Sequence, residues 1–99
     1  MPAPGAPAAP SRAAAPKEAE LLDTAQRVLS TNPERALALT RAHRQRFPNG
    51  VLAQEREVIA IEALSRLGRK DDAKQRSEEF ERTYPGSAHQ RKVESAVEP

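Results

Sequence analysis

Two stretches of this chain, 37 residues apart, repeat the same spacing between a small residue and a proline. Ala36 precedes Pro48 by twelve residues, Ala73 precedes Pro85 by twelve, and an aromatic residue stands directly before each proline. A period of about 20 to 50 residues is typical of repeat proteins, in which each unit buries its apolar face against its neighbours. The sequence therefore predicts two related units stacked in series.

Five segments carry apolar side chains at helical spacing, and no segment shows a useful length of strand alternation. We expect these helices at about residues 17–29, 33–47, 52–67, 71–84 and 87–97. Asn32 is placed to cap the second helix, and Ser87 with Gln90 has the spacing of a capping box at the start of the fifth. The second half of the third helix is apolar on nearly every side, which predicts a central helix. The predicted class is all-α.

Residues 1–16 differ in composition from the rest of the chain. They hold five prolines, seven alanines and a single charged residue. Repeated proline prevents a continuous helix, and apart from Met1 no large apolar side chain is present to offset the entropy of ordering. We expect residues 1–16 to be a disordered Ala/Pro-rich linker. The rest of the chain supplies 18 large apolar side chains, which suffice for one small core.

Several classes of function are disfavoured by what the sequence lacks. There is no cysteine, and His43 and His89, the two histidines, lie far apart without the spacing of metal ligands. No nucleotide-binding or nucleophile motif occurs, and no apolar run reaches the roughly 18 residues of a membrane span. A formal net charge of +2 is too small to indicate nucleic acid. We expect no catalytic residues, no cofactor and no metal, and therefore no enzyme.

The repeat resembles the tetratricopeptide repeat (TPR), a family of paired helices that bind other proteins. Gly68, Ala73 and Pro85 match that motif in the second unit. In the first unit the alanine and the proline match, but Thr31 stands at the glycine position. The resemblance implies two antiparallel helix hairpins and a C-terminal capping helix, at about residues 17–50, 54–87 and 87–97.

A narrower resemblance concerns location. The aromatic-Pro endings look like the repeats of bacterial cell-envelope proteins of the Tol-Pal-coordinator type. Residues 33–93 are similar to the tail domains of membrane-tethered, anti-sigma-factor-like proteins of bacteria. In those proteins an Ala/Pro-rich linker follows a transmembrane helix, and residues 1–16 fit that linker. The resemblance implies a signal-transduction or envelope module on the periplasmic side, tethered through a segment that precedes Met1. A cytoplasmic location is the alternative.

Charge is most unbalanced on the second helix, which carries four arginines against Glu34 alone. These arginines could be a solvated face that complements the helix dipole, or a strip for an acidic protein, nucleic acid or lipid. From this strip we take Arg41 and Arg44 as candidate partner-binding residues. By resemblance, the first helix of each hairpin lines a binding face, which adds Arg27, Gln54 and Glu57.

Other charged and polar residues have a plainer interpretation. We expect the run at residues 55–57 to form a solvated first turn of the third helix. On the fourth helix, acidic residues alternate with Lys74, Arg76 and Arg82, which again predicts a solvated face. His43 lies on an inner stripe and should be packed, whereas His89 should be exposed.

The sequence as a whole predicts a non-catalytic module that binds a peptide, helix or protein domain between its hairpins. Two repeats are fewer than the three or so that a solenoid usually needs, so we expect modest stability or weak self-association. The alternative is a cytoplasmic helical regulatory protein that uses the arginines of the second helix to bind nucleic acid or an acidic partner.

Overall fold

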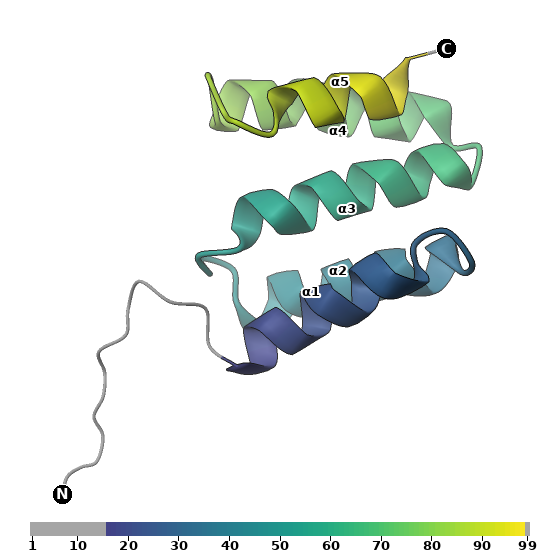
Figure 1. Ribbon diagram of the computed structural model, residues 1–99. Helices are drawn as coiled ribbons and strands as arrows, with labels where there is room; N and C mark the ends of the chain where they lie inside the picture. The colour runs from purple at the N-terminus through teal and green to yellow at the C-terminus, as the bar shows by residue number, and fades with distance from the viewer. Residues whose placement is uncertain (1–15, 99) are drawn as a thin grey trace, which may run out of the picture.

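In the computed structural model, which describes residues 16–98, the chain forms five α-helices and no strand within that range. The helices are α1 (Pro16–Val28), α2 (Pro33–Arg46), α3 (Ala53–Arg66), α4 (Lys70–Thr83) and α5 (Gln90–Val97). Figure 1 shows α1 and α2 running antiparallel as one hairpin, α3 and α4 as a second, and α5 lying beside α4. The all-α prediction is confirmed. The expected linker lies outside the described residues, except for Pro16, which begins α1.

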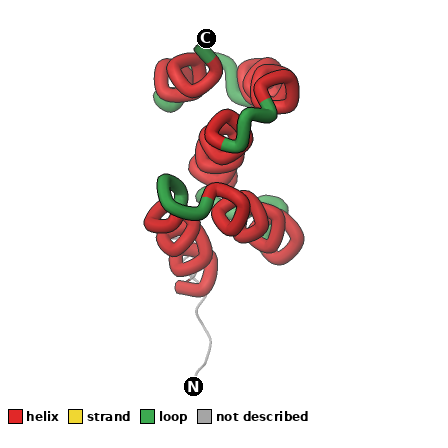
Figure 2. Tube along the Cα trace, turned by 90° about the vertical axis from the view of Figure 1, so that its right-hand side faces the viewer, coloured by secondary structure: helices red, strands yellow, loops and turns green. Residues whose placement is uncertain are grey.

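Helix α3 is the centre of the molecule, as its apolar sequence predicted. It contacts each of the other four helices, whereas no Cα atom of α2 lies within 8 Å of α4 and none of α1 lies within 8 Å of α5. Figure 2, which looks along the helices, shows α3 between the α1/α2 pair and the α4/α5 pair. Helices α2 and α4 lie on one side of α3, and α1 and α5 lie on the other. Helix α3 therefore separates α2 from α4 and α1 from α5.

Local sequence signals account for the helix ends. The Oδ1 atom of Asn32 accepts a hydrogen bond from the backbone N–H of Arg35 at 3.0 Å, so Asn32 caps α2 as predicted. Gly68 follows α3 with a φ of 78°, a left-handed conformation that glycine adopts without steric cost.

The repeat seen in the sequence is also a repeat of backbone geometry and burial. Phe47 ends α2 with φ −132° and ψ 61°, and Tyr84 ends α4 with φ −127° and ψ 62°. Ala36 and Ala73, the small residues expected where helices approach closely, are both buried. The two second helices therefore bury equivalent residues and end in the same backbone conformation.

The start of α5 differs from the prediction. The helix begins at Gln90 with His89 at its N-cap, and no side-chain capping bond forms. The Ser87 hydroxyl donates instead to Oε1 of Gln54 at 2.6 Å and accepts from the N–H of His89 at 3.0 Å. His89 is half-buried rather than exposed, and its Nε2 lies 3.4 Å from Oε2 of Glu55. The hydroxyl of Ser87 therefore lies in the loop before α5, where it bonds to Gln54 and to the backbone of His89.

Candidate partner-binding groove

Two adjoining hollows lie between α2 and α4, with α3 as the floor. The Arg41 hollow, of about 280 Å³, is lined by Leu37, Arg41, Leu64, Arg69, Asp72, Gln75, Arg76 and Glu79. The Arg56 hollow, of about 190 Å³, is lined by Arg44, Arg56, Glu57, Arg76, Glu79, Phe80, Thr83 and Tyr84. Arg76 and Glu79 line both. Together the hollows form one surface, which we call the α2/α4 groove.

The groove is predominantly basic but contains acidic residues. Five arginines and three carboxylates line it. Arg41 and Arg44 are exposed on α2, and within residues 16–98 neither forms an ion pair. Arg69 pairs with Asp72 at 3.0 Å on the opposite wall. The unpaired arginines are therefore concentrated on the α2 side, where a partner's acidic groups would find them.

A compact ion network lies beneath this surface. One carboxylate oxygen of Glu57, Oε2, accepts from Nε of Arg56 at 2.8 Å, and the other, Oε1, accepts from Nε of Arg76 at 2.9 Å. The Glu57 side chain is only 12% exposed and that of Arg56 only 7%. The expectation of a solvated turn at residues 55–57 is therefore wrong for these two residues. The solvated-face prediction also fails at Arg76, which is half-buried, because α4 lies close enough for it to reach Glu57.

The two arginines determine the ionisation of Glu57. Burial alone would raise the pKa of its carboxyl group, but the hydrogen bonds and charges of Arg76 and Arg56 outweigh burial. The pKa of Glu57 is held below its ordinary value of 4.5. At neutral pH this residue is a carboxylate that fixes both guanidinium groups, one on α3 and one on α4.

Of the five residues selected from the sequence, the structure brings three to this groove: Arg41, Arg44 and Glu57. Gln54 lies at the start of α3 and holds Ser87, away from both hollows. Arg27, at the end of α1, is exposed and pairs with Asp23 at 3.4 Å. Arg56, Arg76 and Glu79 also line the groove, and sequence reasoning missed them because their positions depend on the register between α3 and α4.

A second polar cluster joins the first hairpin to the loop that follows it. Glu18, 3% exposed, lies on α1, and its Oε2 is 2.9 Å from Nε2 of the fully buried His43. The same oxygen accepts from the N–H of Leu52 at 3.2 Å. His43 is packed as predicted, but its acidic partner was not foreseen. Gln54 repeats the arrangement in the second hairpin, where it binds Ser87 in the following loop. Both clusters hold the hairpins closed, and neither opens onto the groove.

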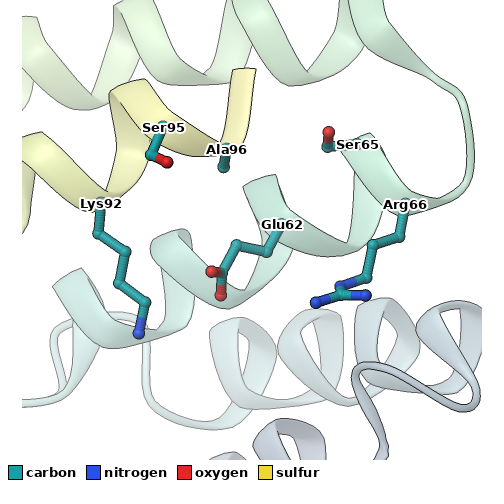
Figure 3. Close-up of a pocket in the computed structure, with 6 residues that line it drawn as sticks. All are labelled: Glu62, Ser65, Arg66, Lys92, Ser95 and Ala96. Carbon is teal, nitrogen blue, oxygen red and sulfur yellow. The ribbon is translucent and has the colours of Figure 1, made fainter. Parts of the chain in front are cut away.

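A further hollow of about 280 Å³ lies between α3 and α5. Figure 3 shows the Glu62 carboxylate between the side chains of Lys92 and Arg66, with Ser65, Ser95 and Ala96 above. No aromatic side chain lines it, and all six lining residues come from two helices. The α2/α4 groove uses three helices from both hairpins and includes two aromatic rings, so it offers the larger and more varied surface.

Among residues 16–98, no group of three or more His, Asp or Glu side chains is placed to hold a metal ion. Over the same range, no helix has both the length and the apolar character needed to cross a membrane. Comparisons with protein-family models, with curated proteins and with solved structures found no match. The fold and the groove define the class: a small helical protein, with five helices in residues 16–98 and an arginine-lined groove between α2 and α4.

Proposed function

We propose that this chain is a non-catalytic protein-interaction module whose α2/α4 groove holds a segment of a partner protein. The observation that carries the proposal is the composition of the groove, in which five arginines, three carboxylates, two leucines and two aromatic rings line one continuous surface. Arginine and aromatic side chains are the residues that most often dominate protein–protein binding. The TPR-like repeat of the sequence supports the same class of function.

The groove fits a protein better than a nucleic acid. Glu57, Glu79 and Asp72 line it together with the arginines, so it lacks the uniformly basic surface that a phosphate backbone favours. Polar groups of both signs beside Phe80 and Tyr84 suit a peptide, which brings apolar side chains together with a few charges.

The sequence resemblance to membrane-tethered bacterial proteins supports an extracytoplasmic position, in a regulatory or envelope protein of the anti-sigma-factor-like or Tol-Pal-coordinator type. On this proposal the module senses or recruits its partner outside the cytoplasm. Fractionation of cells that express the native open reading frame tests the location. Recovery of the protein only with the soluble cytoplasm would contradict it.

A test of the groove compares three baits in cells of the source organism. The first is the wild-type chain, the second carries Arg41→Glu and Arg44→Glu, and the third carries Arg46→Glu and Arg91→Glu. The third has the same change in charge at exposed residues that line neither hollow of the groove. We expect a partner that the wild type and the third bait retain and the second loses. A partner retained equally by all three would overturn the proposal.

Binding of nucleic acid through the arginines is the alternative function, and the excess of arginine in the groove is the observation that favours it. Fluorescence anisotropy with labelled single- and double-stranded oligonucleotides, repeated across salt concentrations, decides the matter. Affinity that falls steeply with salt and is lost in the Arg41→Glu, Arg44→Glu variant would favour nucleic acid. No salt-sensitive binding removes this alternative.

A further inference from the structure

We propose that the Arg56 hollow is a carboxylate subsite, which receives one Asp or Glu side chain of the partner segment. The proposal deepens the proposed function and rests on it. It names the chemical group that the groove selects, and it follows from how Arg56 is held.

The guanidinium of Arg56 is buried with part of its bonding capacity unused. Its Nε donates to Glu57, but among the described residues its Nη1 has no hydrogen-bond partner, although the side chain is only 7% exposed. A buried donor without an acceptor is costly and uncommon in folded proteins. An incoming carboxylate would supply the missing acceptor in the geometry that a guanidinium favours.

The residues already present do not supply that acceptor. Glu57 accepts from Nε of Arg56 at Oε2 and from Nε of Arg76 at Oε1, and neither oxygen is bonded to Nη1 of Arg56. Glu79 lines the hollow but is exposed, and no bond joins it to either arginine among the described residues. The Nη1 donor of Arg56 is therefore left without an acceptor among the described residues.

The charge of the hollow matches one carboxylate. Arg44, Arg56 and Arg76 line it together with Glu57 and Glu79, which leaves one positive charge uncompensated. A carboxylate brings a single negative charge, whereas a phosphate group carries about two at neutral pH and would meet the two glutamates. A volume of about 190 Å³ accommodates a short acidic side chain together with its stem. The Phe80 and Tyr84 rings, whose centroids lie 5.1 Å apart, provide an apolar wall for that stem.

Entry requires a small rearrangement at the rim. Nη1 of Arg56 is closed off from solvent in the unliganded chain. Three residues that line the hollow, Arg44, Glu79 and Thr83, are exposed at the rim, where side-chain rotation would open the way. Arg44 then becomes the second guanidinium that holds the bound carboxylate.

A titration followed by NMR tests the subsite on the full chain without a partner protein. The probe is N-acetylglutamate α-amide, whose only charge is a side-chain carboxylate, added at constant ionic strength. The readout is the Nε–Hε signal of each arginine side chain. We expect saturable shifts at Arg56 and Arg76, and an affinity at least about tenfold weaker in Arg44→Gln and Arg56→Lys. Arg46→Gln, on the same helix but outside the groove, should bind as the wild type does.

Arg44 is exposed and unpaired, so its variant keeps the test valid even if Arg56→Lys perturbs folding. Shifts that do not saturate, equal shifts with N-acetylglutamine α-amide, or tighter binding of methyl phosphate would overturn the subsite. Saturable carboxylate binding without a groove-dependent partner would contradict only the proposed function. A groove-dependent partner without saturable carboxylate binding would contradict only the subsite.

Discussion

At the scale of single residues, Glu57 links two helices through one carboxylate. Its two oxygens bind arginines on α3 and α4, so its charge stabilises both the second hairpin and the floor of the groove. The sequence identified Glu57 as a candidate but interpreted it, together with its neighbours in residues 55–57, as part of a solvated turn. Helical periodicity places a residue on one face of its own helix, and whether another helix covers that face is decided by packing.

Replacing Glu57 with Gln should lower the free energy of unfolding by about 2 kcal/mol at neutral pH, because two guanidinium groups lose their charged acceptor. The folded-state pKa of Glu57 lies below its ordinary value of 4.5, so its stabilisation is complete above that pH. The stabilisation is lost as the pH falls below 4.5 and through the folded-state pKa. Urea unfolding at several pH values measures the difference between the two proteins, which should shrink in acid.

The matched control for Glu57→Gln is Glu81→Gln, an exposed carboxylate on α4. It should change stability by no more than about 0.5 kcal/mol at either pH. A Glu57 effect of the same size in acid and at neutral pH would show that its carboxylate charge is not what stabilises the fold.

Position 50 must be glycine because the buried carboxylate of Glu18 occupies the space that a side chain would need; its backbone conformation does not demand glycine. A Cβ atom at Gly50 would collide with that carboxylate, whose bonds to His43 and to the Leu52 N–H prevent it from moving aside. We expect Gly50→Ala to cost about 1–3 kcal/mol of stability. In a Glu18→Ala background the same change should cost at least about 1 kcal/mol less. A double-mutant cycle measured by urea unfolding checks this, and strict additivity would contradict the contact.

At the scale of elements, helix ends were predictable where the signal was local. Asn32 and Gly68 act within one turn of their own helix, so sequence alone was sufficient. The start of α5 was misjudged: the helix begins at Gln90, and Ser87 lies in the preceding loop, where its hydroxyl donates to Gln54, 33 residues away in the chain. A short sequence motif carries no information about such a distant partner.

Asn32→Ala should destabilise the protein by about 1 kcal/mol, because the Arg35 N–H loses its side-chain acceptor. Asn49→Ala provides the comparison, since Asn49 is exposed in the loop after α2 and makes no side-chain hydrogen bond among the described residues. That variant should lie within about 0.5 kcal/mol of the wild type. Thermal or urea unfolding measures the change in stability of each variant. Equal losses in both variants would mean that Asn32 contributes nothing as a cap.

At the scale of the whole molecule, α3 holds the two hairpins together. Ile61, at its middle, is fully buried, whereas α5 contributes only Val93 to the buried core. Local opening follows the density of such packing. Hydrogen exchange should therefore be slowest in α3 and fastest in α5 and at the start of α1. Mass spectrometry of peptides from exchanged protein measures this order. Exchange in α5 as slow as in α3 would contradict the arrangement.

The stacking of two units and the central helix could be predicted from the sequence. The 37-residue period indicates the two units, and the apolar second half of α3 indicates the central helix. The groove was only partly predictable. Arg41 and Arg44 stood out through the local excess of charge on their helix. Arg56 and Arg76 did not, since their role depends on which faces of α3 and α4 meet. Charge patterns along one helix do not reveal a surface that three helices build together.

The central claim is that partners bind between α2 and α4, and cross-linking from inside that groove tests it most directly. A photo-reactive amino acid is placed at Gln75 in the groove, or at Ser95 in the hollow between α3 and α5; both positions are exposed. Irradiated cells should give a discrete cross-linked protein from position 75, and the Arg41→Glu, Arg44→Glu change should abolish it. A product formed only from position 95, or one insensitive to that change, would contradict the account.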